Sequence, residues 1–374
     1  MPQLPVVAIA LTGALIGACA PVKGPRMWVQ EFPTISRVAC SGLCQDSVTI
    51  RYLGVAGFVV RHGSHTLLTG PSFTNPPFHA SVFAAFPFTR WMLGTLRPDT
   101  TLVDRLLVPD TANIDALLIG HGHYDHALDA PRVLARYGAG AMLVGGRTAI
   151  NMLLGDPAIR DTPGHLITIV DPVAATASSA GQWIYSPSGA FRILAIAADH
   201  APTVKVGLFE WLFANGEVNA PRAHLPRTTA DWRAGESYSY LIDVLVAGSR
   251  DSVALRIYFQ DAPNRPPLGF PPAAIIGGRP VDVAILCVAT AGNVAHSPDS
   301  LLKAMPARIV IAAHWESFFA PQTEPIQANR FTNLTGFERA VRTALPDLSL
   351  YVRPQPQDRV VVGVPLGNPG APRQ

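Results

Sequence analysis

Short apolar segments that end in histidine or aspartate are the feature that most constrains the fold of this 374-residue chain. Residues 114–119 lead through Gly120 into the sequence HGHYDH. Three further segments have the same character: residues 191–198 precede Asp199 and His200, residues 256–260 precede Asp261, and residues 307–313 precede His314. Such runs are typical of buried strands, and layered α/β proteins place their sites where strands end. The sequence therefore predicts that these four strand ends converge.

The HGHYDH motif holds four metal-binding types of side chain within six residues. If strand geometry continues through His121 and His123, the two imidazoles project to the same side, and Gly122 lets the backbone turn tightly. Asp125 and His126 follow this turn and can face a second ion. Imidazole and carboxylate groups at this density suit a borderline ion such as zinc. The alternatives are a His-rich surface loop or an adventitious metal site.

The candidate ligands that follow the other three apolar runs are weaker evidence for a metal site when each is considered alone. A single histidine or aspartate after a strand is usually a cap or a turn residue. Together with the motif, however, His200, Asp261 and His314 are expected to be further ligands. His224 and His296 lie in loops that could reach such a site, and we expect most of the other histidines at the surface or in turns.

The strand and helix patterns predict an α/β fold. Strand patterns occur at residues 48–53, 57–61, 66–69, 114–119, 141–144, 191–197, 237–244, 252–259, 281–288 and 308–313. Helical patterns occur at residues 129–137, 147–154, 299–305 and 336–344. Strands dominate each half and helices follow them, which predicts two sheets sandwiched between helices.

With these residues, the chain resembles the metallo-β-lactamase superfamily of metal-dependent hydrolases. The resemblance rests on HGHYDH at residues 121–126 and on His200, Asp261 and His314, in the family's order. It extends to residues 52–71, YLGVAGFVVRHGSHTLLTGP, which are similar to the first hairpin of the phosphodiesterase and lactonase-like branch. The resemblance covers roughly residues 48–352 and implies a four-layer αββα sandwich.

The resemblance also implies a role for each residue of the motif set. His121, His123 and His200 would bind one zinc ion, Asp125, His126 and His314 would bind the other, and Asp261 would bridge both. Two such ions can lower the pKa of a shared water and polarise the scissile oxygen. Asp125 would also orient the resulting hydroxide, and the chain has no G-x-S-x-G sequence of the serine-hydrolase type.

One position departs from the family's pattern. Where these hairpins often end in an aspartate before proline, this chain has Gly70 before Pro71. That aspartate usually supports a metal ligand, and such supporting groups tune ion affinity and ligand orientation. The chain must therefore support its ligands through another group, or bind the ions less tightly.

The resemblance implies hydrolysis of a phosphodiester or a cyclic ester, including a lipid-like substrate. The alternatives are hydrolysis of β-lactams and a metal-binding lipoprotein without turnover. A formal net charge of +3 and a charged fraction of 15% argue against a broad basic surface, so no nucleic-acid partner is expected.

The amino terminus predicts export. Residues 4–18 are apolar, too short to span a bilayer, and end in Ile16, Gly17, Ala18 and Cys19, which resembles a bacterial lipoprotein cleavage box. We expect residues 1–18 to be removed and Cys19 to anchor the protein to a membrane facing the periplasm. Because no Lys or Arg precedes the apolar run, an ordinary cleaved signal peptide and a misassigned start codon are the alternatives.

The remaining segments complete the predicted organisation. Residues 19–47 form a linker in which Cys40 and Cys44 could close a disulfide in the periplasm or remain free thiols, whereas Cys287 is expected in the core. A hydrolase domain follows at residues 48–366, with a flexible tail at 367–374. Apolar side chains within residues 73–109 and 203–238 are expected to form a lid or groove for an apolar substrate, a membrane contact, or a satellite core.

Overall fold

The computed structural model describes residues 34–38, 44–85, 89, 92–107, 114–162, 166–201, 215–329 and 332–365. Several predicted features lie outside these residues: the leader at 1–18, Cys19, Cys40, the tail at 367–374, and the apolar residues between 203 and 214. The lipid anchor and the disulfide therefore stay predictions. Within the described part of the chain, no helix has the length and apolar character needed to span a bilayer.

The first sheet has eight strands in the order β1-β15-β2-β3-β4-β5-β6-β7. They are β1 (Thr34–Val38), β2 (Cys44–Gly54), β3 (Gly57–His62), β4 (His65–Thr69), β5 (Ile114–Leu118), β6 (Met142–Gly145), β7 (Leu166–Ile169) and β15 (Arg359–Pro365). β2, β3 and β4 pair antiparallel, whereas β4, β5, β6 and β7 pair parallel. The carboxyl end of β5, which leads into HGHYDH, therefore lies at the same edge as those of β4 and β6.

The second sheet has seven strands in the order β14-β13-β12-β11-β10-β9-β8. They are β8 (Ile184–Tyr185), β9 (Phe191–Ala198), β10 (Ser237–Leu245), β11 (Val253–Phe259), β12 (Val281–Cys287), β13 (Ala307–Ala313) and β14 (Leu350–Val352). β10 pairs antiparallel with both β9 and β11, and β11, β12 and β13 pair parallel. β9, β11 and β13 therefore run in one direction and end at one edge.

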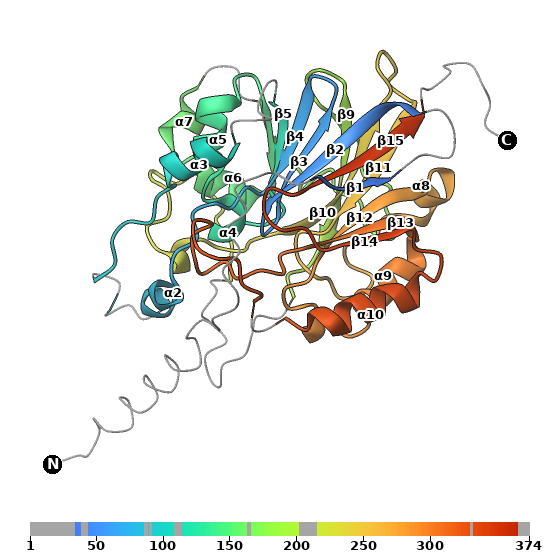
Figure 1. The fold of residues 1–374 in the computed structure, drawn as a ribbon. Coiled ribbons are helices and arrows are strands. Elements are labelled where there is room, and N and C mark those ends of the chain that lie inside the picture. The colour runs from blue at the N-terminus through green and yellow to red at the C-terminus, as the bar shows by residue number, and fades with distance from the viewer. Residues whose placement is uncertain are drawn as a thin grey trace.

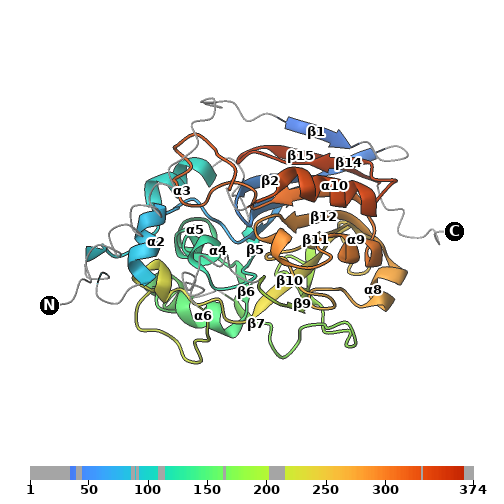
Figure 2. The ribbon, with the colours of Figure 1, turned by 90° about the horizontal axis from the view of Figure 1, so that it is seen from below.

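Helices cover the outer face of each sheet (Figures 1 and 2). α3, α5, α6 and α7 lie beside the first sheet, and α8, α9 and α10 lie beside the second. The helices are α2 (Phe78–Ala85), α3 (Thr100–Leu107), α4 (Tyr124–Ala127), α5 (Ala130–Tyr137), α6 (Arg147–Leu153), α7 (Pro157–Arg160), α8 (Ala273–Gly278), α9 (Asp299–Ala304) and α10 (Leu334–Ala344), with short 3-10 turns η3 (Thr229–Asp231) and η4 (Ala291–Asn293). The predicted α/β sandwich is confirmed.

The composition of the strands explains this layering. All five residues of β5 and all nine of β10 are buried. Strands that are covered on both faces read as nearly continuous apolar runs, because one face meets the other sheet and the other face meets helices. The central strands could therefore be predicted from sequence, and their burial makes the edge of the sheets a rigid support for the residues that follow them.

Candidate metal centre

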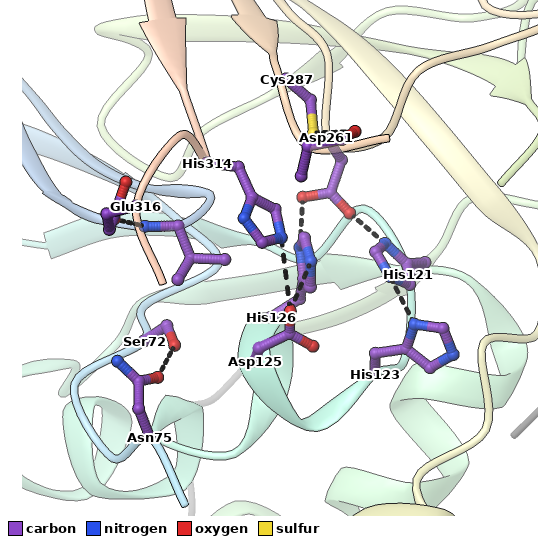
Figure 3. Close-up of polar contacts among 12 residues, drawn as sticks. Ser72, Asn75, His121, His123, Asp125, His126, Asp261, Cys287, His314 and Glu316 are labelled. Atoms are coloured by element: carbon purple, nitrogen blue, oxygen red, sulfur yellow. Dashed lines mark hydrogen bonds and ion pairs between the residues drawn. The ribbon is translucent and has the colours of Figure 1, made fainter. Parts of the chain in front are cut away.

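The four predicted strand ends meet at one edge of the sandwich. β5 leads into His121, β9 into His200, β11 into Asp261 and β13 into His314. Figure 3 shows Asp261 and His314 approaching the motif from the second sheet. Three groups of His and Asp side chains at this edge could each hold a metal ion, with the candidate ligand atoms of each group within 4.8 Å of one another.

The first group contains His121, His123 and His200. Nε2 of His121 and Nδ1 of His123 lie 3.0 Å apart. The ring of His200 lies edge-on to both, with its centroid 4.7 Å from that of His121 and 4.9 Å from that of His123. These are the three residues that the family resemblance assigns to the first ion.

The second group contains Asp125, His126 and His314. Oδ2 of Asp125 lies 3.5 Å from Nε2 of His126 and 3.4 Å from Nε2 of His314. All three side chains are at least nine-tenths buried. Nδ1 of His314 is buried, and no described residue hydrogen-bonds to it. This group matches the set assigned to the second ion.

Asp261 connects the two groups. Its Oδ2 lies 2.5 Å from Nδ1 of His121, and its Oδ1 lies 2.9 Å from Nδ1 of His126. His121, His126 and Asp261 also form the third group of candidate ligands. One carboxylate therefore contacts one imidazole from each of the other two groups, as a bridging residue would.

The three imidazoles of the first group are suited to bind a cation. Burial and the neighbouring His126 lower the pKa of His121, and burial with His121 and His200 lowers that of His123 well below its usual value. Burial and His121 lower the pKa of His200 to about 3. All three are therefore neutral near pH 7, which is the form that binds metal ions.

In contrast to the first group, Asp125 and His126 of the second group, together with Asp261, are charged near pH 7. Burial opposes ionisation of Asp125, but the imidazoles of His126 and His314 outweigh it and lower the pKa of the carboxyl well below its usual value. His126 and His121 likewise lower the pKa of Asp261 against the effect of burial. Against burial, Asp261 and Asp125 raise the pKa of His126 to about 10. Two ionised carboxylates beside one protonated imidazole leave a net negative charge, which suits a divalent cation.

The two groups should differ in the protons they release on binding zinc. A raised pKa keeps His126 protonated below about pH 10, whereas the first group is already neutral. Because a ligand imidazole must lose its proton, the second ion should release about one proton more than the first, and its affinity should rise about tenfold per pH unit. Calorimetric titration in buffers of different ionisation enthalpy measures the number of protons that each ion releases. The titration is done at about pH 6, because this pH lies below the pKa of zinc-bound water near 7. Equal release by both ions would contradict it.

Two glycines of the motif allow the strand ends to approach closely. A Cβ on Gly120 would lie 2.2 Å from the carboxyl group of Asp261, and a Cβ on Gly122 would lie 2.3 Å from the carbonyl oxygen of Arg233. Both distances are shorter than any side chain tolerates. The glycines of IGHGH are therefore required for Asp261 and the segment after η3 to reach the motif.

Gly70 has a physical explanation as well. Its N–H donates to the carbonyl of Leu118, and a Cβ there would lie 2.8 Å from the carbonyl oxygen of His126. Asp129, which sequence reasoning missed, supplies support nearby: its carboxylate accepts hydrogen bonds from the backbone N–H groups of Phe73 at 2.6 Å and Thr74 at 2.8 Å. Asp129 thus ties the segment after the motif to the segment after β4.

Other predicted contributors lie away from the candidate ligands. His224 and His296 are exposed and belong to none of the three groups. Phe73, from the first apolar insertion, is fully buried in the core, as the packing alternative predicts. Phe318 lies beside His314, with ring centroids 4.9 Å apart, and Phe78 contacts Phe319 edge-on at 4.9 Å. Aromatic rings therefore border the second group.

Comparison with known proteins found no matching family model and no matching curated protein. Among solved structures, the chain is similar to Igni18, a metallo hydrolase from the archaeon Ignicoccus hospitalis, with 17% identity and a TM-score of 0.46 over 84% of this chain and 98% of that one. It is also similar to YhfI, a metallo-β-lactamase fold protein from Bacillus subtilis, with 11% identity and a TM-score of 0.45 over 85% and 100% of the two chains.

A third similar structure is CmlA, a diiron β-hydroxylase from Streptomyces venezuelae, with 13% identity and a TM-score of 0.43 over 86% of this chain and 54% of that one. Similarity at these values does not assign an activity. The α/β sandwich and the convergence of seven His and Asp side chains at its edge support the resemblance of this chain to the metallo-β-lactamase superfamily.

Proposed function

We propose that this protein is a metal-dependent hydrolase that uses two divalent ions, with zinc as the expected metal. The observation that carries the proposal is the pair of buried ligand groups joined by Asp261. His121, His123 and His200 would hold one ion, Asp125, His126 and His314 would hold the other, and Asp261 would contact both. Seven ligand-type side chains that converge from four separate chain segments have no simpler structural explanation.

Bound at this site, the ions would supply a low-pKa water and polarise the scissile oxygen. Asp125 is ionised at neutral pH because its pKa lies well below the usual value, so its carboxylate can accept a hydrogen bond from the attacking water and orient it. Burial and the nearby Asp261 raise the pKa of the Cys287 thiol well above its usual value. A buried protonated thiol is a poor nucleophile, which favours attack by water.

The proposed substrate is a phosphodiester or a cyclic ester, including a lipid-like one. The aromatic border of Phe318 and Phe319 beside His314 supports an apolar substituent next to the scissile bond. Activity should be measured after chelation and addition of zinc or manganese, with a phosphodiester, a phospholipid, a lactone and a β-lactam as substrates. Metal-dependent turnover of one substrate establishes its bond class. No turnover of any of them by protein with two bound ions would instead favour a metal-binding role.

We further propose that the protein is exported and anchored to a membrane through Cys19. The proposal rests on the apolar leader and the Ile16-Gly17-Ala18-Cys19 sequence. The mass of the mature amino terminus tests it, because a lipid-modified Cys19 is expected and an unprocessed Met1 would exclude it.

A further inference from the structure

A buried tyrosine and glutamate lie beside the backbone of His314. The Tyr52 hydroxyl lies 2.7 and 2.6 Å from the two carboxylate oxygens of Glu316, to which it donates, and it accepts a hydrogen bond from the His314 N–H at 3.0 Å. Tyr52 is 1% exposed and Glu316 is 5% exposed. Figure 3 shows Glu316 on the far side of His314 from His121 and His123, and Glu316 is in none of the candidate ligand groups.

The pair holds two backbone positions of unfavourable conformation. His314 has φ 54° and Val55 has φ 54°, both in the left-handed region that side chains other than glycine rarely adopt. The Val55 N–H donates to Oε1 of Glu316 at 2.6 Å, and the His314 N–H donates to Tyr52. Such conformations persist where surrounding contacts over-determine them, and they concentrate at functional sites. Here one tyrosine and one carboxylate hold both positions.

The rest of the segment after β13 is fixed from other directions. The Trp315 side chain donates to the carbonyl of Pro354 at 2.7 Å, and its backbone carbonyl accepts from the Asn329 N–H at 2.9 Å. Glu316 forms a backbone bridge with Ala328. Within the described part of the chain, the Tyr52 hydroxyl contacts the backbone N–H of His314 itself. A rotation there would move Nε2 of His314 away from Asp125, which lies 3.4 Å away.

We infer that Tyr52 and Glu316 are positioning residues that hold the His314 imidazole toward Asp125 and so set the affinity for the second metal ion. The inference rests on the proposed metal binding. It adds that this contact affects the affinity for the second ion and not for the first. The first group, His121, His123 and His200, is positioned by β5 and β9 and does not depend on this contact.

The test compares two tyrosine-to-phenylalanine variants of the full chain. Tyr52→Phe removes the hydroxyl that reaches His314. Tyr258→Phe is the matched control, because it removes a buried hydroxyl from the second sheet, which donates to the carbonyl of Gly269 at 2.7 Å. Zinc binding to each chelated protein is measured by equilibrium dialysis, together with thermal unfolding.

Loss of a group that supports a metal ligand typically weakens ion binding about 10- to 100-fold. We expect this loss of affinity for the second ion in Tyr52→Phe, while its affinity for the first ion is unchanged. In Tyr258→Phe, the affinities for both ions should be unchanged. Glu316→Gln should also weaken binding of the second ion, because it removes the negative charge and places an NH2 donor where Oε2 now accepts from the Tyr52 hydroxyl. It provides a second measurement if Tyr52→Phe fails to fold.

Two results would overturn the inference: unchanged affinity for the second ion in both Tyr52→Phe and Glu316→Gln, or an equal loss of both ions that Tyr258→Phe reproduces. The second result would mean that the contact is only structural. If the wild-type chain binds no zinc, the proposed function fails first, and the wild-type measurement distinguishes the two failures.

Discussion

Replacing Asp261 with asparagine should remove both metal ions and with them the activity. The carboxylate contacts an imidazole from each ligand group, and it is fully buried with His121 and His126. Removing one partner of a buried charged pair costs about 3–5 kcal/mol, which corresponds to at least about 100-fold in ion affinity. Because the ions would stabilise several kcal/mol of charge in the transition state, kcat/KM should fall by about 1,000-fold or more.

The matched control for this variant is Asp243→Asn. Asp243 is fully buried on β10, where it pairs with Arg192 and Arg256. It lies six residues along the strand from Ser237, about 20 Å from the end that faces the ligands. Both variants should lose stability in thermal unfolding, but Asp243→Asn should still bind two ions. An Asp261→Asn protein that retains two ions and full turnover would contradict the assigned role of this carboxylate.

Replacing Gly120 with alanine should disrupt the site through its backbone. The new Cβ would overlap the Cβ, the carboxyl carbon and one oxygen of Asp261, each 2.2 Å away. Because these atoms sit at the end of the buried strand β11, relief requires movement of the strand end or of the motif. Overpacking of this kind costs about 1–3 kcal/mol or more, and we expect a lower melting temperature together with loss of bound zinc.

Gly292→Ala provides the comparison, since a Cβ at Gly292 would meet no atom within 4 Å and the residue is exposed. Its stability should stay within about 0.5 kcal/mol of the wild type. Wild-type zinc content and melting temperature in Gly120→Ala would show that the strand ends do not approach as closely as the structure places them.

The central strands could be predicted from sequence because they are buried on both faces. β5, β9, β10, β11, β12 and β13 all fall within the expected ranges to within a few residues. β1, β7, β8, β14 and β15 were missed. Of these, β7, β8 and β14 are short edge strands of two to four residues whose side chains, apart from the buried Val352, are exposed or half-buried. Leu166 of β7 is 52% exposed. Edge strands lack the continuous apolar pattern that identifies a strand in sequence.

The grouping of the candidate ligands could be predicted because the sequence signals that identify them are local. HGHYDH lies within six residues, and each later candidate follows an apolar run. The supporting residues could not be found in this way. Asp129 bonds to Phe73 across 56 positions, and Tyr52 bonds to Glu316 across 264. Nothing in the sequence around Tyr52 indicates a partner so far along the chain, so only the fold reveals the contact.

The number of zinc ions bound per chain tests the central claim most directly. The chelated wild-type protein should be dialysed against zinc, and its metal content counted beside that of Asp261→Asn. We expect two ions per wild-type chain and fewer than one in the variant, because the carboxylate joins both ligand groups. A wild-type protein that binds no zinc, manganese or iron would contradict the metal centre and the hydrolase proposed from it.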